Sequence, residues 1–226
     1  MLLGLLSGCG PHSPEPRATP QPPTIVTLGD SVPAGTGCTC AAFPELYARH
    51  EHAVSINLAA PGLTSADVRA ELRLPAVRDS LLQADEVVIM IGANDVADSF
   101  TDDDAVASGA RTIRTNVRAT IDGIQQLHHT LVIVLGYWNV VRDGRVGVTT
   151  YGEKGVEVST RATGTVNDAL AAAADDGGAV YLSTEPAFHG LDGSQDPTAL
   201  LIADGDHPNS AGHNAIARLL PPVSRS

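Results

Sequence analysis

Five short apolar runs, each separated from the next by a longer segment, constrain the fold of this chain more than any other feature. Several of the runs are dominated by Val and Ile and show little polar alternation, which is typical of strands buried on both faces of a parallel sheet. The segments between the runs carry apolar residues at helical spacing. The expected strands are 24–28, 53–58, 86–91, 130–135 and 179–182, and the expected helices are 65–74, 104–128, 157–174 and 210–220.

This alternation predicts an α/β fold, namely a three-layer α/β/α, flavodoxin-like domain with a five-stranded parallel sheet. The chain has 226 residues, of which 43% are hydrophobic, so it is long enough for one domain with a full core. In an open parallel sheet, ligands bind at the carboxyl ends of the strands. The chemistry of such a domain is therefore expected in the segments that follow the strands.

The charge balance and the cysteine pattern exclude several classes of partner and cofactor. Lys and Arg total 14 against 26 Asp and Glu, for a net charge of −12, which disfavours binding to nucleic acid or to an anionic membrane surface. Three cysteines without a C-x-x-C pair, and without an H-E-x-x-H string, provide none of the common zinc sites. A Gly35-Thr36-Gly37 string follows the first strand, but Cys40 stands where a dinucleotide-binding loop needs its third glycine. We expect no metal, no cofactor and a monomer that acts on a small molecule.

The first residues resemble the export signal of a bacterial lipoprotein. Residues 1–9 form a short apolar run that ends in Leu6-Ser7-Gly8-Cys9, which matches a lipobox because a small residue precedes the cysteine. The positive charges that begin a signal peptide are missing, so we interpret 1–9 as a truncated signal. Six of the fifteen prolines lie between positions 11 and 23, and 10–22 is expected to be an extended tether before a folded domain at 23–226.

The lipobox resemblance implies cleavage before Cys9 and acylation of its thiol. The protein is then expected to be exported and lipid-anchored in the cell envelope, or secreted, with the membrane as a partner only through the lipid on Cys9. The alternative is an apolar N-terminus with an incidental cysteine.

Four short polar strings lie where this fold places its chemistry. Ser31 directly follows the first strand, and a preceding glycine lets the backbone turn sharply. The other strings follow the second strand, follow the third strand, and precede the last helix. Each string has a plain alternative as a turn or a helix N-cap, but four together favour a functional site. The strings are Gly29-Asp30-Ser31, Ala60-Pro61-Gly62, Gly92-Ala93-Asn94-Asp95 and Asp204-Gly205-Asp206-His207.

In their order, these strings resemble the four blocks of the SGNH (GDSL-type) hydrolases, a family that includes bacterial esterases and lipases. The resemblance covers 24 to about 220. It implies the α/β/α fold and a serine esterase that hydrolyses carboxylic, acyl or acetyl, esters without a cofactor. It also implies that the oxyanion hole is formed by the backbone N–H groups of Ser31 and Gly62 and the side-chain amide of Asn94.

The residue types agree with this chemistry. A serine hydroxyl needs a base to attack a carbonyl, and His207 is the candidate base for Ser31. A carboxylate must hold the imidazole in one tautomer, and Asp204 can fold back through a turn at Gly205 to reach it. Asp206 competes for the same ring, but the family spacing favours Asp204. Asp30 and Asp95 are expected to be structural.

Three functions remain in comparison. The first is hydrolysis of a small-molecule or carbohydrate ester through an acyl-enzyme on Ser31. The second is O-acyl transfer or deacetylation on cell-envelope carbohydrate, which uses the same triad and which the sequence does not separate from the first. The third, a non-catalytic glycan-binding lipoprotein, is disfavoured because the full set of catalytic groups is present.

Other residues are assigned more plainly. Tyr137, Trp138 and Asn139 follow the fourth strand and are expected to form an acyl or sugar subsite, and 138–156 is expected to be a loop insert that sets specificity. His189 is expected to be a solvent-exposed loop residue, with a place in the wall of a substrate pocket as its alternative. His213, like the pair at 128–129, is expected to be solvated or to cap a helix. Cys38 and Cys40 can form a disulfide or remain a dithiol.

Overall fold

The computed structural model describes residues 21–223, which contain a five-stranded parallel sheet in the order β2-β1-β3-β4-β5. All four strand pairs are parallel. The predicted sheet is confirmed, and each expected strand agrees with the structure to within one residue at either end. The strands are β1 (Thr24–Gly29), β2 (Val54–Asn57), β3 (Glu86–Met90), β4 (Leu131–Leu135) and β5 (Val180–Leu182).

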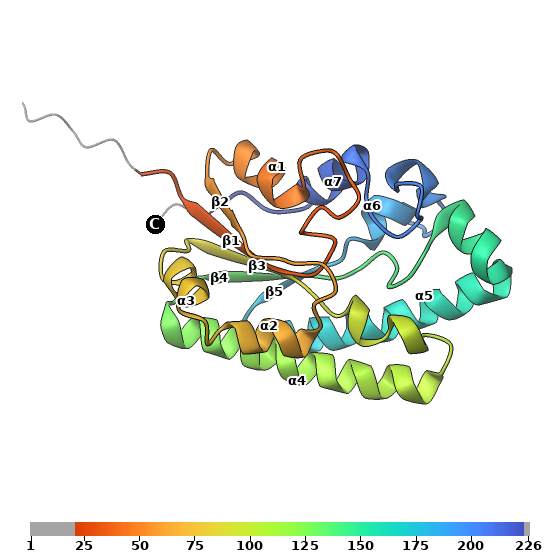
Figure 1. The fold of residues 1–226 in the computed structure, drawn as a ribbon, viewed down its shortest axis with the longest axis horizontal. Coiled ribbons are helices and arrows are strands. Elements are labelled where there is room, and N and C mark those ends of the chain that lie inside the picture. Colours follow the sequence, from red (N-terminus) through yellow and green to blue (C-terminus); the bar gives the residue numbers. More distant parts are fainter. Residues whose placement is uncertain (1–20, 224–226) are drawn as a thin grey trace, which may run out of the picture.

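Helices cover both faces of the sheet and complete the three-layer α/β/α fold (Figure 1). One face carries α1 (Phe43–His50) and α7 (Ser210–Ala217), which pack on each other. The other carries α2 (Ser65–Glu71), α4 (Asp103–Leu127) and most of α5 (Gly144–Gly177). Shorter elements fill the connections: α3 (Pro75–Leu81), α6 (Glu185–His189), and the 3₁₀ turns η1 (Ala93–Asp95), η2 (Ala97–Ser99) and η3 (Pro197–Leu200).

The central strands form the core, as their composition requires. Every residue of β3 is buried, and only the first residue of β1 and of β4 is partly accessible. Strands covered on both faces exclude water, so their Val and Ile side chains lie in the apolar core together with side chains from the helices. The rigid sheet thereby fixes the positions of the loops at its carboxyl edge.

The structure corrects the expected loop at 138–156. Asp143 caps a helix that begins at Gly144, so 144–156 is helical and continues into the segment predicted from 157. The helix is kinked at Gly152, which has φ 71° and ψ 169°, a conformation that favours glycine. Glycine and β-branched residues hid this first part from sequence reasoning because both have low helix propensity. The sequence also gave no expectation for α1, α3 or α6, which are short and carry Pro near their first turn.

The N-terminal assignments lie mostly outside the described residues. Cys9 and the segment 1–9 are among them, as is nearly all of 10–22. The division into signal, tether and domain, and the lipid anchor, therefore stay predictions. Between residues 21 and 223, no helix is both long and apolar enough to cross a membrane.

Candidate active site

The turn after β1 presents Ser31 at the carboxyl edge of the sheet. Gly29 has φ 156°, and a Cβ there would overlap the backbone oxygen of Met90 on the neighbouring strand. The Asp30 backbone N–H donates to that same oxygen at 3.2 Å. Glycine is therefore required for the chain to pass so close to β3 and then turn. Ser31 follows with a partly accessible side chain.

Asp30 holds this turn from inside the protein. Its carboxylate accepts the Val32 backbone N–H at 3.1 Å and the phenolic O–H of Tyr137, a buried residue that follows β4. Burial raises the pKa of the Asp30 carboxyl to about 6, against the opposing effect of these hydrogen bonds. The expectation that Asp30 is structural agrees with this arrangement. The expectation that Tyr137 forms part of a substrate subsite is wrong, because its hydroxyl is buried against Asp30.

Three N–H donors border the same edge. Within the described residues, the backbone N–H groups of Ser31 and Gly62 donate to no protein acceptor. The Asn94 side chain donates one amide N–H to the Leu63 carbonyl at 2.8 Å, which fixes its orientation and leaves its second N–H available. Gly62 has φ 81°, so glycine suits the backbone conformation there. These are the three groups that the sequence assigns to an oxyanion hole.

Asp95 ties the loops of Gly62 and Asn94 together. Its carboxylate accepts the Ser65 backbone N–H at 2.9 Å and the Ser65 hydroxyl at 2.6 Å. Burial raises the pKa of the Asp95 carboxyl, although the bonds from Ser65 act in the opposite direction. Because Ser65 begins α2, this contact anchors the loop after β2 to the loop after β3, in agreement with a structural role for Asp95.

Asp204 and His207 meet across a tight turn before α7. One Asp204 oxygen accepts the backbone N–H groups of Asp206 at 2.8 Å and His207 at 3.0 Å. The other lies 2.7 Å from Nδ1 of the His207 ring. Burial alone would raise the pKa of the Asp204 carboxyl, but these hydrogen bonds outweigh it and the pKa lies below its ordinary value. Gly205 supplies the φ of 72° that the turn needs.

The structure also distinguishes the two candidate aspartates. Asp206 contributes its backbone N–H to the Asp204 carboxylate, and within the described residues its own carboxylate makes no hydrogen bond to His207. Burial raises the pKa of the Asp206 carboxyl. His207 lies close enough to the nucleophile turn for its charge to act on Asp30. No hydrogen bond joins Ser31 to His207 in the described residues, and Nε2 of that ring has no protein partner.

The comparison with protein families decides the assignment. Residues 27–215 match the GDSL-like lipase/acylhydrolase family, a span that begins in β1 and ends in α7. The chain belongs to this family. Its members are acylhydrolases, and this protein is accordingly a hydrolase of ester bonds. No curated protein has a sequence that matches the chain.

Solved structures confirm the fold of this hydrolase. A lipase from goat rumen metagenome is 19% identical with a TM-score of 0.69, covering 87% of this chain and 94% of the other. Phospholipase A1 from Streptomyces albidoflavus is 20% identical with a TM-score of 0.65, covering 88% and 100%. An acetyl-xylooligosaccharide esterase from Geobacillus is 17% identical with a TM-score of 0.64, covering 90% and 97%.

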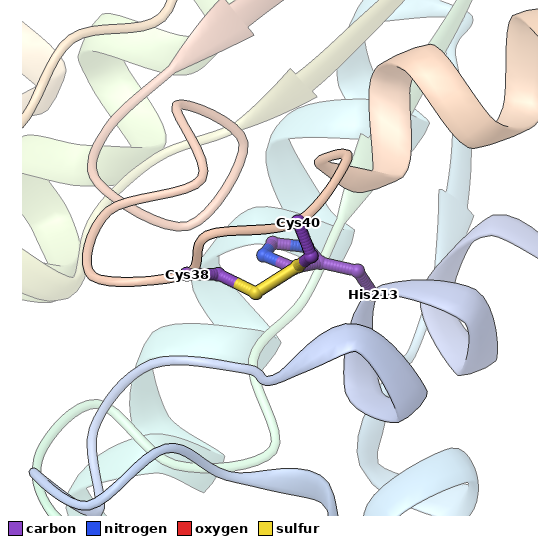
Figure 2. A group of neighbouring side chains, drawn as sticks. All are labelled: Cys38, Cys40 and His213. Atoms are coloured by element: carbon purple, nitrogen blue, oxygen red, sulfur yellow. A yellow bond between two sulfur atoms is a disulfide. The ribbon is translucent and has the colours of Figure 1, made fainter.

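A disulfide in this acylhydrolase joins Cys38 to Cys40 in the loop after Ser31, which decides between the two states that the sequence left open (Figure 2). His213 extends from α7 to this disulfide, and one ring nitrogen lies within 4.8 Å of both sulfurs. The ring is fully buried, and its Nδ1 accepts the Phe43 backbone N–H at the start of α1. The expectation that His213 is solvated is therefore wrong; it caps a neighbouring helix. With both sulfurs bonded to each other, the cluster offers no thiolate ligand for a metal.

A second histidine–aspartate pair, which the sequence did not indicate, lies beside the catalytic turn. His189 ends α6, and its Nε2 lies 3.0 Å from a carboxylate oxygen of the buried Asp143. Its Nδ1 lies 3.3 Å from the Gln195 carbonyl. The hydrogen bond to Asp143 raises the pKa of His189, although burial opposes it. The expectation of a solvent-exposed loop histidine is wrong, since the side chain is only 19% exposed. The two residues are 46 positions apart, and no spacing signal links them.

Trp138 and Asn139 are neighbours in sequence, but only Trp138 lines a cavity. Asn139 is buried and braces α5 through Ser159, so its expected place in a subsite is wrong. Trp138 stacks on Phe188 with ring centroids 3.9 Å apart, and it lines a cavity of about 530 Å³ together with Asp143 and His189. The cavity lies next to the catalytic turn, and neither Ser31 nor His207 lines it.

Proposed function

We propose that the protein is a serine esterase that cleaves carboxylic esters through an acyl-enzyme on Ser31. One observation carries the proposal: the Asp204 carboxylate is 2.7 Å from Nδ1 of His207, while Nε2 of the same ring has no partner among the described residues. A ring held in this way presents a free basic nitrogen, which is what a serine nucleophile requires. Membership of an acylhydrolase family supports the same chemistry.

The reaction begins when the Ser31 hydroxyl oxygen attacks the ester carbonyl carbon. Nε2 of His207 takes the hydroxyl proton as the new C–O bond forms, and the Asp204 carboxylate stabilises the resulting imidazolium. The tetrahedral intermediate then breaks its bond to the alcohol, which leaves with the proton from His207. Water attacks the acyl-enzyme with the same base, and the acid departs as Ser31 regains its proton.

Negative charge develops on the carbonyl oxygen in both steps. Within the described residues, the backbone N–H groups of Ser31 and Gly62 and the second side-chain N–H of Asn94 have no competing protein acceptor, and they are the donors that we assign to this oxygen. Donors that are already oriented stabilise the transition state without reorganisation during the reaction. Asn94 is oriented by Leu63, and its loop is anchored through Asp95.

The test is hydrolysis of ethyl acetate by Ser31→Ala. Loss of the nucleophile should lower kcat by about 10⁴-fold or more, leaving the rate that binding and the oxyanion hole alone supply. Ser80→Ala, on α3 at the opposite edge of the sheet, is the matched control and should keep full activity. Both variants should show the wild-type far-UV circular dichroism. Near-normal turnover by Ser31→Ala would refute the assignment.

A further inference from the structure

The cavity that Trp138 lines is attached directly to the turn that carries the catalytic pair. The Asp143 backbone N–H donates to the Gly205 carbonyl at 2.7 Å. A Cβ on Gly205 would collide with the Val146 side chain, so α5 packs tightly against this turn. The cavity wall at Asp143 therefore contacts, through Gly205, the turn that carries Asp204 and His207. The volume of about 530 Å³ is within the range of about 300–1,000 Å³ that is usual for small-molecule sites.

The cavity wall carries charged groups of both signs and two hydroxyls. Its carboxylates come from the end of the β4 loop, from α6 and from the segment before η3, and its cations from α5 and α6. An alkyl chain entering the cavity would remove water from these groups and return no hydrogen bonds, which is costly. A polyhydroxylated ligand can donate to the carboxylates and accept from the cations. The polar side chains are Asp143, Arg145, Thr149, Thr160, Glu185, His189 and Asp196.

Trp138 adds an aromatic surface and an unused donor. Its ring is held by stacking on Phe188 at an interplanar angle of 9°. Its indole N–H is buried and has no acceptor within the described residues, although such groups are usually paired. Apolar side chains of Val148, Val156 and Pro197 complete the wall. Aromatic and apolar surface beside carboxylates and hydroxyls matches a sugar ring, which has an apolar C–H face and an edge of hydroxyls.

We propose that this cavity is the subsite for the alcohol part of the ester, and that this alcohol is a sugar. The proposal rests on the serine esterase function stated above. The acyl group would lie at Ser31 and the three N–H donors, while the sugar occupies the space between α5, α6 and η3. The Asp143–His189 pair forms the wall nearest to the catalytic turn, and the exposed side chains of Arg145, Glu185 and Asp196 bind the sugar hydroxyls.

Binding can be measured without catalysis because Trp138 is the single tryptophan of the chain. Titration of Ser31→Ala with 6-O-acetylglucose, which keeps its other hydroxyls free, should give a saturable change in intrinsic fluorescence, and ethyl acetate at the same concentration should give none. Thr160→Phe, which fills the cavity from α5, should weaken the sugar ester at least tenfold, about 1.4 kcal/mol. Thr165→Phe is the control. Like Thr160, Thr165 is exposed on α5 and its hydroxyl donates to the carbonyl four residues earlier, but Thr165 does not line the cavity.

Kinetics with Ser31 intact provide the second measurement. The ratio of kcat/KM for 6-O-acetylglucose to that for ethyl acetate should fall at least tenfold in Thr160→Phe and stay unchanged in Thr165→Phe. An unchanged ratio, absence of saturable fluorescence, or displacement of the sugar ester by decyl acetate would each overturn the sugar subsite. Failure of the esterase function would give a different result. The wild-type protein would then leave ethyl acetate intact, while the sugar ester would still change the fluorescence of Trp138.

Discussion

Two histidine–aspartate pairs lie at the carboxyl edge of the sheet, and the hydrogen bond from the Asp143 backbone N–H to the Gly205 carbonyl joins them. They differ in whether the second ring nitrogen of the histidine has a protein partner. His207 offers Nδ1 to Asp204 and leaves Nε2 without a protein partner. His189 has the Asp143 carboxylate at one nitrogen and the Gln195 carbonyl at the other. Because both of these partners only accept, both bonds form only when His189 is protonated. A histidine beside a carboxylate is a base only if its other nitrogen is free.

Burial separates the pairs further. Asp143 is 4% exposed and its carboxylate also accepts the Gly144 backbone N–H at 2.6 Å as the N-cap of α5, so it is committed to structure. Asp204 is 38% exposed, and His207 is 14% exposed. The difference lies in the carboxylates, since the histidines are similarly exposed, His207 at 14% and His189 at 19%. The Asp143–His189 pair joins α5 to α6 and supports the turn of Asp204 and His207 through the Asp143 backbone N–H.

Among variants that test the difference between the two pairs, Asp204→Asn is expected to have the largest effect on kcat. The amide keeps the shape of the turn, but it favours the wrong imidazole tautomer and cannot stabilise the imidazolium, so kcat should fall by up to about 10⁴-fold. Asp206→Asn is the matched control and should change kcat little, because its carboxylate makes no hydrogen bond to the His207 ring in the described residues. Hydrolysis of ethyl acetate by both variants measures the difference. Equal losses would show that the structure pairs His207 with the wrong aspartate.

An intermediate effect on kcat is expected from Asn94→Ala, because Asn94 is assigned to the same reaction as the Asp204–His207 pair. It removes one of three oxyanion donors, so kcat should fall about 10²- to 10³-fold while KM changes little. Gln83→Ala removes another side-chain amide, which donates to the Asp79 carbonyl at the end of α3 and, within the described residues, makes no hydrogen bond to the Ser65–Asp95 network, and serves as the control. Steady-state kinetics with ethyl acetate separate the two parameters. A raised KM with unchanged kcat would make Asn94 a substrate-binding residue instead.

The smallest effect is expected from His189→Gln, and it should appear in stability. The folded-state pKa of His189 is raised by Asp143, so the stabilisation is fully present below the unfolded value of about 6.5 and is lost as pH rises through the folded value. The substitution should lower Tm by about 2–4 °C at pH 6, as a loss of about 1 kcal/mol does in a protein of this size, and by less at pH 9. Glu185 and Asp196 also act electrostatically on this ring, and the hydrogen bonds from Thr198 hold the pKa of the Asp196 carboxyl below its ordinary value.

Differential scanning calorimetry at the two pH values measures this effect. His128→Gln, an exposed histidine at the end of α4, is the control and should leave Tm unchanged at both. A loss that is equal at pH 6 and pH 9, or larger at pH 9, would contradict an imidazolium at His189. A loss of ester cleavage comparable with that of Asp204→Asn would end the distinction between the pairs.

The first pair was predictable from sequence and the second was not, for a physical reason. Asp204 and His207 are three residues apart, so the chain itself brings them together at Gly205. Asp143 and His189 meet only because α5 starts at 144, and its Gly and Thr content conceals that helix. The strands were predictable because burial on both faces demands unbroken apolar runs.

Other contacts depend on tertiary packing in the same way. Tyr137 reaches Asp30 across 107 residues, and no local pattern indicates that its hydroxyl is already bound. His213 looks like a polar residue on a terminal helix, yet it is buried because it satisfies the first N–H of α1. A polar side chain in the sequence does not reveal whether its partner is solvent, substrate or backbone.

The central claim is that Ser31 is the nucleophile and that His207, held by Asp204, activates it. The most direct test is to react the protein with a fluorophosphonate and locate the adduct by mass spectrometry of its peptides, because this reagent modifies an activated serine. The account predicts an adduct on Ser31 that forms much more slowly in Asp204→Asn and at the wild-type rate in Asp206→Asn. An adduct on another serine, or labelling of Ser31 that is indifferent to Asp204, would contradict it.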